Sequence, residues 1–315
     1  MTAFPTIEID DLHTVRDWLR FGTTAFTRAG LTFGHGTQTA VDEAAFLILM
    51  SLNLPIDQLE PWLDARLTRS ERIDLALLFQ RRLTTRKPAA YLVNAAFIQG
   101  HWFYVDERVI VPRSYIGELL LAEGFSSMVN DGQPVTTVLD LCTGSGCLAI
   151  LAAKVFPSCT VDAIDLSAGA LTVAQTNVAH YGLEERVTLI QSNLFAHVPS
   201  GKHYNLIIAN PPYVAAAEVA AFAPEYRHEP QMAHQGGADG LDFVREILAE
   251  ANAHLTSQGT LVVEIGTSRE ALEAAYPELP FFWLDTQTSE GEVFALSAAA
   301  LAQADLKPAQ RKRSR

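Results

Sequence analysis

The sequence predicts an α/β fold, in which a parallel sheet is covered by helices on both faces and is preceded by a small helical domain. Three observations support this prediction. The chain has 315 residues, of which 49% are hydrophobic and 19% charged, so it can bury a large core and is long enough for two domains. Residues 1–95 carry helical patterns only. After Pro134, short apolar runs alternate with helical patterns, which is typical of a parallel sheet.

The N-terminal domain is expected to span residues 1–95 and to consist of helices. Residues 11–30 and 42–54 carry apolar side chains at helical spacing. A third helix is expected over residues 66–83, with Ser70 as a candidate for its start, although no Glu or Gln stands three residues further on to complete a capping box.

A connector is expected over residues 96–133. Aromatic and β-branched residues surround Gly100 and the polar turn at 106–108, a pattern that predicts a β-hairpin. A polar segment at 130–134 then separates the connector from the sheet domain.

Residues 134–300 contain the pattern expected of the sheet domain. Six apolar runs predict strands, and residues 167–180 and 241–254 predict helices between them. In chain order the strand candidates are TTVLDLC, CTVDAID, RVTLIQS, YNLIIAN, GTLVVEIG and PFFWLDT. In such a sheet ligands bind beyond the carboxyl ends of the strands, so residues at those ends are the first candidates for a functional site.

The first strand ends in a glycine loop with the sequence LDLCTGSGC. Gly144 and Gly146 let the backbone come close to a ligand, and the amides at the start of the next helix can bind a polar or anionic group. The second strand ends at Asp165, whose carboxylate can accept hydrogen bonds from both hydroxyls of a ribose. Together these residues predict a site for a nucleoside-type cofactor.

The loop alone leaves the kind of cofactor open. Gly144, Gly146 and Ala149 fit the G-x-G-x-x-A pattern of dinucleotide-binding proteins, and a purely structural turn is a further interpretation. Asp140 with the run TGSG after it instead resembles the cofactor loop of S-adenosyl-L-methionine-dependent methyltransferases. Cys142 stands where most of those loops have glycine, so its backbone is expected either to avoid a positive φ or to accept strain.

The fourth strand ends in the tetrad Asn210-Pro211-Pro212-Tyr213. Its prolines cannot continue a strand, and an ordinary strand stop is the alternative interpretation. A planar nitrogen is a poor nucleophile. The Asn210 side-chain carbonyl and the Pro211 backbone carbonyl can accept its two N–H bonds, and Tyr213 offers a ring for stacking. We therefore expect the tetrad to bind the substrate and catalyse methyl transfer to a planar nitrogen of adenine, cytosine or glutamine, with no metal.

With these motifs the sequence resembles the HemK-type protein glutamine methyltransferases over nearly the whole chain. The segments that carry the resemblance are GHGT, FYVDERVIVPRS, LDLCTGSGC, NPPYV and EYRHEP. Several of them are closer to the branch that methylates large-subunit ribosomal protein three than to the branch that methylates peptide chain release factors. The resemblance implies a seven-stranded, Rossmann-like class I methyltransferase domain, S-adenosyl-L-methionine as cofactor, and a glutamine amide of ribosomal protein three as acceptor.

The resemblance also implies which residues form the site. The cofactor-binding candidates are Asp140, Thr143, Gly144, Ser145, Gly146, Asp165, Asn193, Leu194 and Asn210. The substrate glutamine is expected at Asn210, Pro211, Pro212 and Tyr213. Asn193 departs from the aspartate that many relatives have near the adenine. Two roles stay open: Arg113 either fixes the connector over the site or forms a surface salt bridge, and Glu264 either lines the pocket or caps its strand.

The charge distribution bears on the partners. The formal net charge is −13, and residues 101–306 hold 25 acidic against 8 basic residues. A body this acidic should repel bare nucleic acid, so we expect no direct DNA binding, which disfavours an adenine DNA methyltransferase. The basic tail at 301–315 predicts either a solvated terminus or, more weakly, contact with ribosomal RNA. A non-catalytic ribosome-assembly protein is a further alternative.

The remaining features predict a location. The three cysteines match no disulfide framework and no zinc pattern. No secretory signal and no apolar stretch long enough for a membrane span is visible, so a cytoplasmic protein is expected.

Overall fold

Two compact units make up the computed structural model, which describes residues 10–304. The helical unit comprises the described residues through Ala96 together with Val105–Glu107 and Phe222–Glu229. The remaining described residues form the sheet unit. Most of the tail expected at 301–315 lies outside the described residues.

Capping boxes start the three long helices of the helical unit. Its helices are α1 (Val15–Arg28), α2 (Ala40–Ser51), η1 (Glu60–Trp62), α3 (Arg69–Thr85) and α4 (Ala89–Val93). In each long helix a threonine accepts a hydrogen bond from the amide three residues on, and the acid there bonds back: Thr14 with Asp17, Thr39 with Asp42, and Thr68 with Glu71. The prediction that Ser70 starts the third helix is wrong, because Thr68 is the cap and Glu71 is the acid that completes its box.

A buried ion cluster, formed by Glu43, Arg82, Arg86 and Glu225, holds the segment Phe222–Glu229 in the helical unit. Arg82 Nε lies 2.6 Å from Glu43 Oε1, and Arg86 Nη2 lies 2.6 Å from Glu225 Oε1. Glu43, Arg82 and Glu225 are at most 1% exposed. Because removal of one partner from a buried pair leaves the other charge desolvated, this cluster fixes the segment in place.

The connector contains the expected hairpin. β1 (Ala96–Ile98) and β2 (His101–Phe103) form a two-stranded sheet. Gln99 and Gly100 between them have φ values of 48° and 76°, so both turn residues are left-handed, as two-residue hairpin turns favour.

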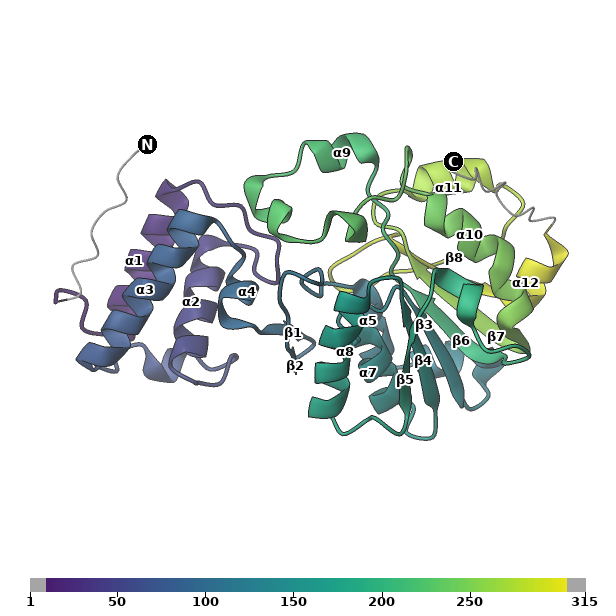
Figure 1. Ribbon diagram of the computed structural model, residues 1–315, viewed down its shortest axis with the longest axis horizontal. Helices are drawn as coiled ribbons and strands as arrows, with labels where there is room; N and C mark the ends of the chain where they lie inside the picture. The colour runs from purple at the N-terminus through teal and green to yellow at the C-terminus, as the bar shows by residue number, and fades with distance from the viewer. Residues whose placement is uncertain (1–9, 305–315) are drawn as a thin grey trace. The chain divides into compact units, whose positions relative to one another are not determined.

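Seven strands form the main sheet in the order β5-β4-β3-β6-β7-β9-β8 (Figure 1). They are β3 (Thr137–Leu141), β4 (Thr160–Asp165), β5 (Val187–Gln191), β6 (Tyr204–Ala209), β7 (Leu255–Glu264), β8 (Phe282–Leu284) and β9 (Val293–Ser297). The pairs among β3 to β7 are parallel, whereas β9 is antiparallel to both β7 and β8. The α/β prediction is confirmed. The antiparallel β9 was not expected, and the loop of residues 285–292 before it is too short for the crossover that a parallel strand needs.

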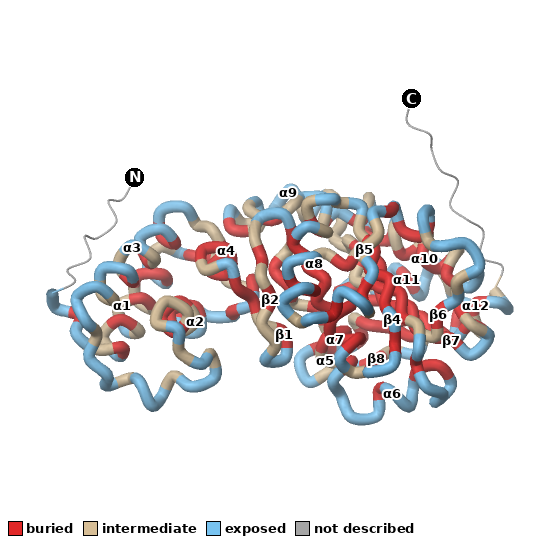
Figure 2. Tube along the Cα trace, turned by 60° about the horizontal axis from the view of Figure 1, so that its bottom comes forward, coloured by how far each residue is buried: buried red, intermediate tan, exposed pale blue. Residues whose placement is uncertain are grey.

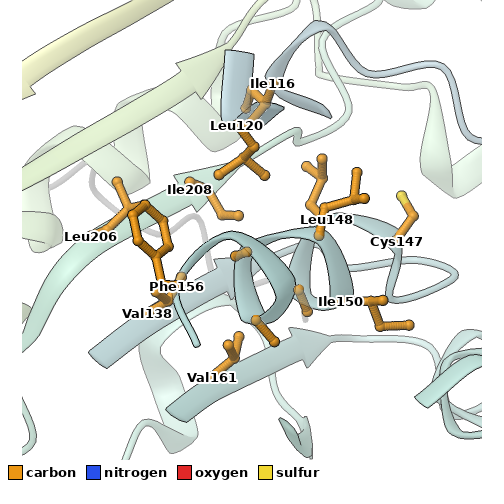
Figure 3. Close-up of a cluster of buried hydrophobic side chains, with 14 of the residues drawn as sticks. Ile116, Leu120, Val138, Cys147, Leu148, Ile150, Phe156, Val161, Leu206 and Ile208 are labelled. Atoms are coloured by element: carbon orange, nitrogen blue, oxygen red, sulfur yellow. The ribbon is translucent and has the colours of Figure 1, made fainter. Parts of the chain in front are cut away.

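Helices cover both faces of this sheet (Figure 1). One face packs against α5 (Tyr115–Leu121), α7 (Cys147–Val155) and α8 (Ala168–His180), and the other against α10 (Asp242–Glu250), α11 (Arg269–Ala275) and α12 (Ala298–Gln303). Alternate residues of one strand serve opposite faces: Leu206 and Ile208 of β6 join the first core, and Ile207 joins the second. In Figure 3 side chains of α7 such as Leu148 meet the first core.

Short elements complete the sheet unit and the segment held in the helical unit. They are α6 (Phe125–Met128), η2 (Asn130–Gly132), η3 (Leu194–His197), α9 (Ala216–Ala220), η4 (Pro224–His228), η5 (Gln231–Ala233) and η6 (Ala251–His254). Figure 2 shows that the central strands are buried along most of their length. Over residues 10–304, none of the helices combines the length and apolar character needed to cross a bilayer.

Candidate active site

A cavity opens at the carboxyl edge of the sheet, beside the point between β3 and β6 where the strand order reverses. Four neighbouring strands contribute their end residues to its wall. These are Cys142 and Gly144 after β3, Asp165 at the end of β4, Ser192, Asn193 and Leu194 after β5, and Asn210 and Pro212 after β6. The other wall residues are mainly apolar: Arg108, Val109, Ile110, Ile164, Leu166, Ser167, Ala170, Pro230, Met232, Ala233 and Phe243.

The glycine loop takes its shape from left-handed backbone positions. Gly144 and Gly146 have φ values of 57° and 80°. A Cβ on Gly144 would meet no atom within 4 Å, so this cavity residue leaves room for a ligand. A Cβ on Gly146 would lie 3.1 Å from Cβ of Ala174, so glycine there serves close packing against α8.

Cys142 adopts the left-handed conformation that glycine would take more easily. Its φ is 59°, so of the two expected outcomes the chain accepts the strain, which costs about 1 kcal/mol for a residue with a side chain. Burial raises the pKa of the Cys142 thiol well above its ordinary value, with nearby Asp165 and Asp140 adding to the rise. The thiol is therefore a neutral part of the cavity wall.

Asp140 holds the glycine loop in place through hydrogen bonds. Its Oδ2 accepts hydrogen bonds from Thr143 Oγ1 at 2.5 Å and from the Ala149 amide at 3.0 Å. Its Oδ1 is buried and finds no hydrogen-bond partner within the described chain. Burial raises the pKa of Asp140 to about 7, although its two donors oppose the rise. Asp140 therefore fixes the loop to the first turn of α7 and is not part of the cavity wall.

Asp165 is placed to bind a nucleoside. Its Oδ2 accepts the Gly144 amide at 2.9 Å and its Oδ1 accepts the Ser167 amide at 2.8 Å. Each oxygen keeps lone-pair capacity for a further donor, such as a ribose hydroxyl. Burial raises the pKa of Asp165, while the backbone amides oppose the rise. A carboxylate, loop amides and an apolar wall fit the ribose and adenine of S-adenosyl-L-methionine.

The tetrad is seated on three glycines, Gly236, Gly240 and Gly266, which we call the glycine seat. A Cβ on Gly236 would lie 2.5 Å from the Pro212 carbonyl oxygen, and one on Gly240 would lie 2.3 Å from the Tyr213 carbonyl oxygen. A Cβ on Gly266 would lie 2.7 Å from the Tyr213 ring. Only glycine permits these approaches, so the seat determines where the tetrad lies.

Glu264 does not line the cavity but joins the connector to the tetrad, whereas the two alternatives for Arg113 stay open. Glu264 is 1% exposed and contributes nothing to the cavity wall. It accepts hydrogen bonds from Ser114, from Tyr115 and from Tyr213 of the tetrad. Arg113 donates to the Val111 carbonyl within the connector at 3.0 Å, and its charge lowers the pKa of Tyr213 against the raising effect of burial.

The structure brings only part of the predicted site to the cavity wall. Six predicted residues lie there: Gly144, Asp165, Asn193, Leu194, Asn210 and Pro212. The other six do not line it: Asp140, Thr143, Ser145, Gly146, Pro211 and Tyr213. Sequence reasoning missed the apolar wall and the glycine seat, although the glycine-rich run QGGADG was a visible signal for the seat. Within residues 10–304 no group of three or more His, Cys, Asp or Glu side chains is placed to hold a metal ion.

The strand order, the glycine loop, the strand-end acid and the tetrad define a Rossmann-like class I methyltransferase that uses S-adenosyl-L-methionine. Residues 116–225 match the family described as the methyltransferase small domain. A ribosomal protein uL3 glutamine methyltransferase of Burkholderia pseudomallei is 52% identical over 307 residues, which cover 96% of this chain and 98% of that protein. The chain belongs to the family of ribosomal protein uL3 glutamine methyltransferases, uL3 being large-subunit protein three, and the HemK-type resemblance is confirmed.

A second curated relative and two solved structures give further comparisons. The enzyme of the same name from Bradyrhizobium diazoefficiens is 54% identical over 296 residues, or 92% of each chain. Among solved structures, the ribosomal protein L11 methylase of Lactobacillus delbrueckii subsp. bulgaricus is 25% identical, covers 52% of this chain and 69% of its own, and has a TM-score of 0.36. The hMettl16 catalytic domain in complex with an RNA hairpin is 12% identical over 77% of this chain and 85% of its own, with a TM-score of 0.49. Structural likenesses of this strength carry no argument about function.

Proposed function

We propose that this protein transfers a methyl group from S-adenosyl-L-methionine to the side-chain amide nitrogen of a glutamine in ribosomal protein uL3. One observation carries the proposal. Asn210 and Pro212 of the tetrad line the same cavity as Gly144 and Asp165, so groups suited to an amide and groups suited to a nucleoside share one space. The family to which the chain belongs supplies the acceptor.

The tetrad would prepare the amide for attack. The Asn210 side-chain carbonyl and the Pro211 backbone carbonyl accept the two N–H bonds, and the Tyr213 ring stacks on the amide plane. When bound, the cofactor supplies an electrophilic methyl group on a sulfonium. The two carbonyls would direct the nitrogen lone pair toward that methyl group, whose bond to sulfur would break as the bond to nitrogen forms, and the nitrogen would then lose one proton. Most of the acceleration comes from holding the reacting atoms at attack distance.

We propose that Asp165, Asn193, Leu194 and Asn210 contact the cofactor together with the amides of residues 143–146. Thr143 and Ser145 are 5% and 3% exposed, so their contribution is through the backbone or through loop shape. Asp140 acts through the loop.

Residues 1–95 are proposed to recognise the protein substrate, but deleting them is a poor test. Glu225 belongs to the helical unit and is buried against Arg86. Deletion of residues 1–95 would therefore leave the Glu225 carboxylate in the remaining chain without its cationic partner. Leu77 on α3 is 55% exposed and offers a milder test. Leu77→Glu should raise KM for uL3 and leave the cofactor Kd unchanged, whereas an unchanged KM would speak against α3 as a recognition surface.

We further propose no direct DNA binding, because residues 101–306 are strongly acidic. A cytoplasmic location is proposed because the three cysteines match no disulfide framework. Contact of the tail with ribosomal RNA is a proposal that rests on its basic residues alone.

The deciding experiment offers labelled S-adenosyl-L-methionine with purified uL3, release factor and duplex DNA side by side, and locates the label by mass spectrometry. Label on a glutamine of uL3 alone is expected. Label on release factor would keep the cofactor and the tetrad but overturn the substrate. Label on DNA would overturn the substrate class.

A further inference from the structure

Glu264 is a buried acid beside the tetrad that the mechanism leaves unused. It is the last residue of β7, and the pairing of Ala209 with Val263 places Asn210 and Glu264 at the same edge of the sheet. It does not contribute to the cavity wall.

The Glu264 carboxyl joins two segments. Oε2 accepts hydrogen bonds from Ser114 Oγ at 2.6 Å and from the Tyr115 amide at 2.9 Å, at the start of α5. Oε1 accepts a hydrogen bond from the Tyr213 hydroxyl at 3.3 Å. Burial raises the pKa of Glu264 to about 7, against the effect of these donors, so the acid is retained at a desolvation cost.

Tyr213 has its backbone fixed by the glycine seat, because its carbonyl lies against Gly240. Its ring lies against Gly266, where a side chain would collide with it. The hydroxyl bond to Glu264 fixes the far end of the ring. Three contacts therefore determine the plane that faces the substrate amide.

We propose that Glu264 is a positioning residue, which holds the Tyr213 ring in the orientation in which the tetrad receives the substrate amide. The inference rests on the proposed function. It assigns to the start of α5 a part in aligning the tetrad, because Ser114 and Tyr115 bind the same carboxyl.

A double-mutant cycle tests this role. Glu264→Ala should lower kcat about 10-fold, the effect of losing one hydrogen bond, and leave the cofactor Kd unchanged. In a Tyr213→Phe background, which lacks the hydroxyl, the same substitution should have little further effect. Glu264→Gln should restore most of kcat, because its amide can still bond Tyr213 and Ser114. Glu118→Ala is the matched control, since Glu118 accepts bonds from Gln287 and Thr288 and should leave kcat unchanged.

Several outcomes would overturn the inference. Losses of kcat that multiply in the double variant would mean that Glu264 does not act through the Tyr213 hydroxyl. A weakened cofactor Kd would mean that it supports the cavity instead. If Glu264→Ala does not fold, Glu264→Met keeps the volume and is measured in the same cycle. If the wild type methylates uL3 and Glu264→Ala retains full kcat, the inference is refuted but the proposed function stands. If the wild type does not methylate uL3, both the proposed function and the inference are refuted.

Discussion

The two units bury acidic side chains in different ways. In the helical unit Glu43 and Glu225 lie against Arg82 and Arg86, so each carboxylate has a cationic neighbour. In the sheet unit Asp140 and Glu264 are as deeply buried, but the hydrogen bonds found for them come from hydroxyls and backbone amides.

This difference separates acids that stabilise the tertiary structure from acids that stand next to the candidate site. Burial raises the pKa of Glu43, but Arg82 opposes the rise with its charge and its hydrogen bond, so the pair acts as a fixed tie. The pKa values of Asp140 and Glu264 rise to about 7, and both acids stand next to the candidate site. Buried acids with a raised pKa beside a cavity are typical of functional sites, whereas acids paired with a buried arginine are typical of tertiary ties. Substitutions in the ion cluster should therefore change stability first, and substitutions at the sheet edge should change rate first.

The largest effect is expected in the ion cluster. Arg82→Met should lower the free energy of unfolding by about 3–5 kcal/mol, because it leaves Glu43 buried without its partner. Chemical denaturation measures the loss. Arg16→Met is the control, because the Arg16–Asp64 pair is exposed and its loss should leave stability unchanged. An Arg82→Met variant as stable as the wild type would contradict the view that the buried Glu43–Arg82 pair stabilises the helical unit.

At the sheet edge, Asn210→Ala should lower kcat about 100-fold or more, because it removes one of two acceptors at the reacting nitrogen. Single-turnover transfer to uL3 measures the rate, and thermal unfolding checks that the fold is intact. Near-normal turnover would exclude the tetrad as the catalytic site.

The pH dependence of stability sharpens the comparison further. The pKa of Glu264 is about 7 in the folded chain and 4.5 for the free side chain, so the protonated acid stabilises the fold at low pH and this contribution disappears as the pH rises through 7. The change corresponds to about 3 kcal/mol for Glu264. Glu264→Gln should flatten the decline between pH 4.5 and 7.5 in urea unfolding. An equally steep decline in the variant would show that Glu264 does not titrate in this range.

The smallest effect is expected at Cys142. Cys142→Gly removes the strain of a left-handed residue, and after allowance for the more flexible unfolded chain it should raise the free energy of unfolding by no more than about 0.5 kcal/mol. The change in denaturation midpoint measures it. Destabilisation would mean that the thiol's packing outweighs its backbone strain.

The sequence was sufficient to predict site residues whose position depends on the local pattern of the chain. Apolar runs that end in Asp165 and Asn210 predicted strand ends, and the structure places both residues at the wall of one cavity. Pattern reasoning failed where a contact joins distant segments. The Thr32 amide bonds Glu225, 193 residues further along the chain, and no local pattern indicates that pair.

The glycine seat and β9 illustrate the same limit. Gly240 and Gly266 are required by atoms of Tyr213, which are near only in the folded chain. Val293–Ser297 is a short apolar run whose partner β7 precedes it by a helix and a further strand. A pattern can show that such a run is buried, but not beside which strand.

The placement of Phe222–Glu229 in the helical unit has a consequence for folding during synthesis on the ribosome. A ribosome delivers α1 to α4 long before it delivers Glu225, and the strands β3 to β6 are made in between. During that interval Arg86 lacks Glu225, so the helical unit stays incomplete although its helices are synthesised first. The N-terminal helices complete their set of ion pairs only after most of the parallel sheet has left the ribosome.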